Sequence, residues 1–167
     1  MFQTKERFLM SWQFEATSTQ KLLNQLNDDS LNQEITPNHW TLGRVAWHIV
    51  TAIRVISSQT NLRFEGPAED FPVPTSSTFI SESYKQASQA FTEAIQTQWS
   101  DHNLQDIIEF FGQKMPVGTL LLFLLQHQTH HRGQLTVLMR QAGIDVSGVY
   151  GPSKDEWAAL GMEAPKM

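Results

Sequence analysis

The chain has 167 residues, of which 40% are hydrophobic, 17% are charged and none is cysteine. Disulfides, thiolate-ligated metal sites and cysteine nucleophiles are therefore excluded. The 12 basic residues are outnumbered by 17 acidic ones, the formal net charge is −5, and there is no basic run. This charge balance argues against nucleic-acid partners and against anionic membrane surfaces. The length suits one domain, which we expect to span residues 1–167.

The N-terminal stretch MFQTKERFLMSWQFEATS has neither the apolar core nor the small-residue cleavage site of a secretory signal. The longest apolar run, near residues 119–125, is far too short to cross a bilayer. These two features predict a soluble cytoplasmic protein.

Four segments carry apolar residues at helical spacing. The first helix is expected from Lys5 to Leu26, where apolar residues recur at three- and four-residue steps. The second is expected to open at Thr36–Pro37, because threonine can cap free amides and proline fits the first helical position. It is expected to end near Ser57.

No periodicity is present from residue 58 to residue 78, a segment that contains several prolines. A connection this long is unusual in a compact domain, but a crossover between two parallel helices must travel the full height of a bundle. A third helix is expected to follow and to run to about Trp99. Residues 100–118 are expected to be irregular, although Ile107–Gly112 could form a short extended segment.

The fourth helix is expected to begin near Pro116 and to end before Gly143, a residue suited to a left-handed cap. Ser153 and Glu156 have the spacing of a capping box, which predicts a short C-terminal helix ended by Gly161. Four long helical patterns without convincing strand alternation predict an all-α four-helix bundle, with a long crossover between its second and third helices.

The histidines of the fourth helix are the main functional signal. His127 and His131 are four residues apart, which puts their Cβ atoms about 5–6 Å apart on one helical face. His48 lies mid-helix among apolar neighbours, and helix packing could bring its ring to the same point. Three neutral nitrogen donors suit zinc, nickel, copper or iron, and they leave open positions on the ion, as catalytic metal sites do.

The alternative is that these histidines are hydrogen-bonded core residues. We expect His130 at the surface or in contact with a ligand residue rather than on the ion, and His39 and His102 to face solvent. Gln128 occupies the position of the glutamate in His-Glu-x-x-His proteases, which argues against peptidase chemistry.

Other residues near these histidines are expected to have structural roles. Gln134 could hydrogen-bond a ligand or simply pack, and Arg132 is expected to pair with a carboxylate or to cap carbonyls. Gly133 is expected to permit close approach of another helix. Four aromatic residues are expected in the core rather than in a pocket wall: Trp12, Trp40, Trp47 and Tyr150.

Two motifs together resemble a known family. The stretch His127–Leu135 (HQTHHRGQL) resembles the signature of the DinB-like (DinB/YfiT-like) superfamily, and Trp40–Ile49 (WTLGRVAWHI) is similar to its second-helix motif. The segment Gly148–Ser153 (GVYGPS) is also similar to members of this superfamily. The resemblance spans nearly the whole chain.

This resemblance implies an up-down-down-up bundle in which His48, His127 and His131 bind one divalent ion, nickel or zinc first, with iron or manganese as alternatives. It also implies a homodimer and a small-molecule substrate. Members of known activity include transferases and isomerases that use thiols such as bacillithiol, mycothiol or glutathione. We therefore expect a thiol-dependent S-transferase or a related metal-assisted transferase or hydrolase. The alternatives are a non-catalytic metal- or ligand-binding dimer and a purely structural bundle.

Overall fold

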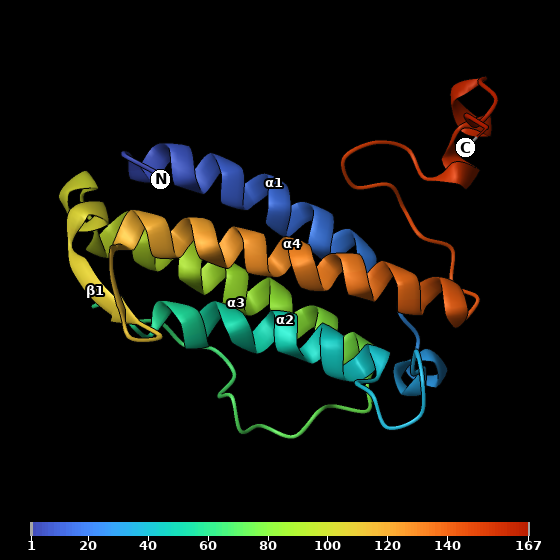
Figure 1. Cartoon of the computed structure of the whole chain (residues 1–167), viewed down its shortest axis with the longest axis horizontal. Helices are drawn as coiled ribbons and strands as arrows, with labels where there is room; N and C mark the ends of the chain where they lie inside the picture. The colour runs from blue at the N-terminus through green and yellow to red at the C-terminus, as the bar shows by residue number, and fades with distance from the viewer. Residues whose placement is uncertain (1, 167) are drawn as a thin grey trace.

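The computed structural model describes residues 2–166, and four long helices in it form a bundle (Figure 1). Their bounds are α1 Lys5–Leu23, α2 Leu42–Ser57, α3 Ser77–Gln98 and α4 Val117–Gln141. In Figure 1, α1 and α4 run in one direction while α2 and α3 run in the other. Residues 58–76 return along the length of the bundle between α2 and α3. The predicted bundle topology and its long crossover are confirmed.

The second helix begins later than the Thr36–Pro37 start that the sequence predicts. Its cap is Thr41, whose Oγ1 accepts a hydrogen bond of 3.1 Å from the backbone N–H of Arg44. Upstream, Asn38 has a left-handed φ of 66°, and Glu34 pairs with Thr41 in an isolated antiparallel bridge. A left-handed residue interrupts a right-handed helix, so this segment is a loop.

A short 3-10 helix, η1 (Asp28–Asn32), follows the end of α1, which is at Leu23 rather than at Leu26. The Asp28 carboxylate accepts hydrogen bonds of 2.7 Å from both the backbone N–H and the hydroxyl of Ser77. These two bonds lower the pKa of Asp28 and join the loop after α1 to the start of α3.

A β-hairpin joins α3 to α4 in the segment that the sequence predicts to be irregular. After η2 (Asp101–Gln105), strand β1 (Ile107–Phe110) pairs antiparallel with β2 (Gln113–Pro116). The turn residues Phe111 and Gly112 both have positive φ angles, of 49° and 74°, as in a type I′ turn. The expected extended segment is therefore confirmed as β1, whereas its partner strand carries no clear alternation and escapes prediction.

The C-terminal segment is close to its prediction. Gly143, with a φ of 75°, follows the end of α4. The predicted short helix is present as two 3-10 turns, η3 (Lys154–Glu156) and η4 (Ala158–Leu160), and the second is capped by left-handed Gly161. The Glu156 carboxylate accepts a hydrogen bond of 2.8 Å from the backbone N–H of Ser153, which is the contact expected of the capping box.

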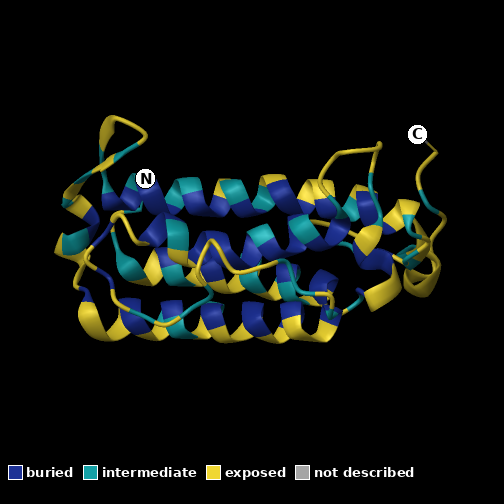
Figure 2. Cartoon of the chain, turned by 90° about the horizontal axis from the view of Figure 1, so that it is seen from below, coloured by how far each residue is buried: buried dark blue, intermediate teal, exposed yellow. Residues whose placement is uncertain are grey.

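Buried residues line the inner faces of the helices (Figure 2). Trp12 and Trp47 belong to this core, as predicted, and the Trp47 indole N–H donates a hydrogen bond of 3.2 Å to the Phe71 carbonyl in the crossover. Trp40 and Tyr150 do not, because they are 52% and 64% exposed. The prediction that they pack in the core is wrong.

Within the four helices, Gly43 rather than Gly133 permits the close approach of another element. A Cβ at Gly43 would lie 3.1 Å from both the Cβ and the carbonyl oxygen of Leu31, whereas a Cβ at Gly133 would meet nothing within 4 Å. The close approach predicted at Gly133 is therefore wrong. No helix in residues 2–166 combines the length and the apolar character that a membrane crossing requires.

Candidate metal centre

Helices α2 and α4 bring the three predicted histidines together. His48 Nε2 lies 3.2 Å from His127 Nε2, and one ring nitrogen of each histidine lies within 4.8 Å of the others. The centroid of the His131 ring is 4.4 Å from each of the other two centroids. His131 is buried and its two partners are half-buried, so the cluster sits at the edge of the core.

The spacing of these nitrogens fits a shared ion. Two nitrogens that each lie about 2.0–2.1 Å from a tetrahedral ion are roughly 3.3 Å apart, and the His48–His127 distance of 3.2 Å is close to this value. Two neutral lone pairs at that distance repel each other unless a proton or a cation lies between them. No carboxylate joins the cluster in the described part of the chain, so the donor set is three imidazoles that could hold a metal ion.

Gln134 orients one of the three rings. Its Oε1 lies 2.8 Å from His131 Nδ1, which makes Nδ1–H the donor and leaves His131 Nε2 free for an ion. Its amide nitrogen lies 3.3 Å from Nε2 of His130, which is exposed and does not join the cluster. Gln134 therefore hydrogen-bonds a candidate ligand instead of only packing, and the surface position predicted for His130 is confirmed.

Two other predicted positions are confirmed, because His39 and His102 are both exposed. His127 Nδ1 is buried without a hydrogen-bond partner among residues 2–166, so packing must hold this ring in place. Phe123 supplies part of that packing, with its ring centroid 5.8 Å from that of His127.

Burial keeps the three imidazoles neutral at physiological pH. Burial, the larger cause, and the nearby His131 together lower the pKa values of His48 and His127 to about 4. Burial also lowers the pKa of His131. Neutral imidazole is the form that binds metals, so the site needs little proton release before an ion enters.

The metal-free protein should become more stable as pH rises from about 4 to 6.5. In this window the unfolded chain protonates His48 and His127, whose ordinary pKa is 6.5, while the folded chain, with values of about 4, does not. Thermal unfolding at several pH values, with a chelator present, measures the slope of stability against pH. The double variant His48→Gln/His127→Gln should have a smaller slope than the wild type, and an equal slope in the double variant would contradict the assignment.

Replacing Gln134 with leucine should weaken zinc or nickel binding about 10- to 100-fold, because the hydrogen bond that fixes the His131 ring is lost. Competition with a chromophoric chelator measures the change. The matched control is Gln141→Leu, an exposed position at the end of the same helix. Equal affinities of the two variants would exclude an orienting role for Gln134.

Trp40 forms one wall of the site. Its ring centroid lies 5.7 Å from that of His48 and 6.3 Å from that of His131, and the Arg44 guanidinium lies 5.7 Å from its centre. The loop before α2 holds this indole outside the core but over the histidines. This contact depends on the path of the loop, which the sequence pattern does not reveal.

Two pockets adjoin the cluster. One of about 390 Å³ reaches His48 and His127, and one of about 520 Å³ lies beyond Trp40, next to Gln134. Gly133 lines the second pocket, where its missing side chain leaves space. A larger hollow of about 930 Å³ lies between α1 and α3, but none of the three histidines lines it.

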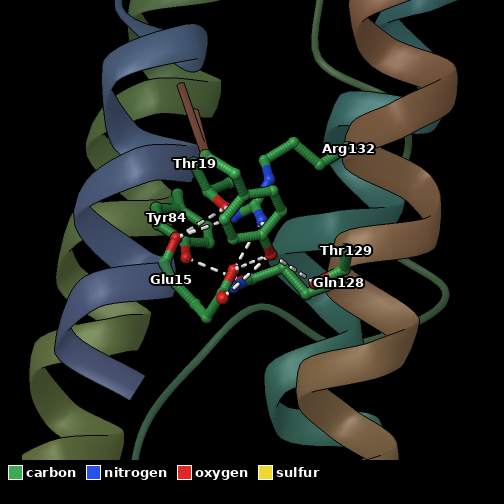
Figure 3. A network of polar contacts seen from close by, with 7 residues as sticks. Glu15, Thr19, Tyr84, Gln128, Thr129 and Arg132 are labelled. Atoms are coloured by element: carbon green, nitrogen blue, oxygen red, sulfur yellow. Dashed lines mark hydrogen bonds and ion pairs between the residues drawn. The ribbon is translucent and has the colours of Figure 1, made fainter. Parts of the chain in front are cut away.

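A buried polar network occupies a different face of α4 (Figure 3). Arg132 forms an ion pair of 2.5 Å with the Glu15 carboxylate and donates a hydrogen bond of 3.1 Å to the Glu15 carbonyl, so both predicted contacts are confirmed. The Tyr150 hydroxyl lies 2.6 Å from Arg132 and 2.9 Å from Glu15.

Gln128 accepts a hydrogen bond of 2.7 Å from buried Tyr84 in this region (Figure 3). It therefore does not take the place of a base at the histidines.

Comparisons with known proteins agree with this fold. The chain is 65% identical over 167 residues to the uncharacterised protein YrdA of Bacillus subtilis (strain 168), with both chains fully covered. Among solved structures, it resembles a DinB-like protein from Bacillus cereus ATCC 10987 with a TM-score of 0.87 and 59% identity, covering 90% of this chain and all of that one.

The fold also matches a more distant structure, the DinB-like protein YjoA of Bacillus subtilis, with a TM-score of 0.68 and 21% identity. That match covers 87% of this chain and 98% of the other. The profile described as DinB family matches residues 1–167, and the chain therefore belongs to the DinB family.

Proposed function

We propose that this protein is a metal-dependent enzyme that activates a small nucleophile at the three-histidine cluster, and that it acts as a thiol S-transferase. The observation that supports this most is the convergence of three neutral imidazoles from α2 and α4 without a carboxylate. Three protein ligands leave room on the ion for a reactant, as in catalytic rather than structural sites. A bound divalent ion would lower the pKa of a thiol or water that it coordinates.

In this proposal, His48, His127 and His131 hold the ion, and Gln134 fixes the ring of His131. Nitrogen donors favour nickel or zinc over manganese, with iron as an intermediate case. Trp40 stands against two of the three rings and limits access of water from its side.

The side chains around the cluster favour a thiol over water as the nucleophile. Gln128 hydrogen-bonds Tyr84 away from the histidines, and no carboxylate belongs to the cluster within residues 2–166. A free thiol has a pKa of about 8.5, far below that of water. A thiol therefore needs much less help from a general base, which suits a histidine cluster without a carboxylate.

The proposal is tested by turnover of a bimane-type electrophile with several low-molecular-weight thiols. The metal-loaded protein should conjugate at least one thiol, and both a chelator and His127→Ala should remove the activity, whereas exposed His102→Ala should keep it. Stoichiometric metal binding without turnover of any thiol would instead support a non-catalytic metal-binding module. The expected homodimer and cytoplasmic location stay predictions; light scattering tests the first.

A further inference from the structure

The tip of the β-hairpin carries an aromatic residue that neither its backbone nor its burial explains. Phe111 occupies the first central position of a type I′ turn with a φ of 49°, where glycine, asparagine and aspartate are favoured. The residue is 87% exposed, so its side chain gains little from the hydrophobic effect. A residue held in an unfavourable conformation at the surface suggests a role in function.

This residue lies at one end of a row of aromatic rings that leads to the candidate metal centre. The ring centroids of Phe111 and Phe110 are 4.3 Å apart, and those of Phe110 and Phe123 are 5.1 Å apart. Phe123 in turn lies 5.8 Å from His127. The hairpin is thus connected to the histidines by contacting aromatic side chains.

These rings line the pocket of about 390 Å³ that opens beside His48 and His127. Its opposite wall is formed by α2, with apolar residues that include Val55 and Ile56. A molecule bound to an ion at the histidines could therefore extend along an apolar channel toward Phe111. Pockets with apolar walls and a few polar groups at one end are typical of small-molecule sites.

The charge of the pocket indicates what it would accept. Of the described residues that line the pocket, one carries a formal charge, Glu69, and none is a lysine or an arginine. Away from the histidines, such a lining offers no cationic partner to a carboxylate and suits neutral groups. The pocket is therefore better suited to the electrophile than to the thiol.

We propose that the pocket binds the aromatic part of a neutral electrophilic substrate, and that Phe111 stacks on this part and determines specificity. The inference rests on the proposed function, because it takes the histidine-bound ion as the place where the substrate reacts. It adds a substrate class and a specificity residue, which the metal centre alone does not define.

Two probes with the same metal-binding group test the inference without an activity assay. Acetohydroxamate and benzohydroxamate differ by a methyl and a phenyl group, and their binding to the zinc-loaded protein is measured by calorimetry. Benzohydroxamate should bind about tenfold more tightly, because its ring enters the apolar channel. Phe111→Ala should reduce benzohydroxamate affinity about three- to tenfold and leave acetohydroxamate affinity unchanged.

The matched control is Phe14→Ala, which removes another exposed phenylalanine, one that does not line this pocket. It should change neither affinity. The inference is overturned, while the metal centre stands, if both hydroxamates bind with equal affinity. It is also overturned if Phe111→Ala leaves the affinity for benzohydroxamate unchanged. If neither probe binds the zinc-loaded protein, the proposed function fails and the inference fails with it.

A second variant separates function from structure. Asparagine adopts a positive φ more readily than phenylalanine does, so Phe111→Asn should raise Tm by about 1–3 °C. It should also reduce the affinity for benzohydroxamate as much as Phe111→Ala does. A clear fall in Tm would show that Phe111 serves the hairpin itself, and that outcome would overturn its role in specificity.

Discussion

Replacing His127 with alanine should abolish binding of one divalent ion per chain. The change removes the nitrogen that lies 3.2 Å from His48 Nε2 and leaves two donors where the structure brings three together. Residues that only support a ligand contribute about 10- to 100-fold in affinity, so loss of a ligand should exceed 100-fold. Elemental analysis of the purified protein and competition with a chromophoric chelator measure the stoichiometry and the affinity.

His130→Ala is the matched comparison, because His130 lies on the same helix but is exposed and outside the three-histidine cluster, where it contacts the amide of Gln134 and the ring of His131. This variant should retain one ion per chain. Circular dichroism should show helical content equal to that of the wild type in both variants. Retention of the ion in His127→Ala would contradict the ligand set, and its loss in both variants would require His130 as a further ligand.

Replacing Arg132 with alanine should have the largest effect on stability, about 3–5 kcal/mol, because it leaves a largely buried Glu15 carboxylate without its cation. The side chains of Arg132 and Glu15 are only 3% and 14% exposed. A loss of this size should lower Tm by roughly 6–20 °C in a chain of this length. Urea unfolding followed by circular dichroism measures it.

Two further variants identify the cause. Arg140→Ala, at an exposed position later in α4, should change stability by less than about 0.5 kcal/mol. The double replacement Arg132→Met/Glu15→Leu should recover most of the loss, because removing both charges leaves neither one buried alone. Since Arg132 contacts Glu15 and not the three histidines, Arg132→Ala should still bind metal. A loss below about 1 kcal/mol would show that water replaces the missing cation.

Local spacing predicted the parts of the site that lie on one helix. The four-residue separation of His127 and His131 requires only helical geometry, and the position of His48 in an apolar helix made it a suitable third member. The length of the connection after α2 predicted the parallel α2–α3 pair, because a short loop cannot span a bundle. These inferences depend on periodicity and chain length alone.

The features that escaped prediction depend on tertiary contacts or on unfavourable local conformation. Thr36–Pro37 has good helix-start residues, but the left-handed Asn38 stops a helix there and Thr41 caps it instead. Trp40 looks like a core residue, yet the same loop holds it over the histidines. Phe111 is a poor choice for its turn, so no turn preference signalled the hairpin.

Anomalous scattering from crystals grown with zinc or nickel would locate the ion itself. We predict one strong peak per chain, about 2.0–2.2 Å from a nitrogen of each of His48, His127 and His131. The fourth position should be open to solvent or to an added ligand. A peak elsewhere, or three imidazoles hydrogen-bonded directly to one another with no peak between them, would contradict a metal centre at this cluster.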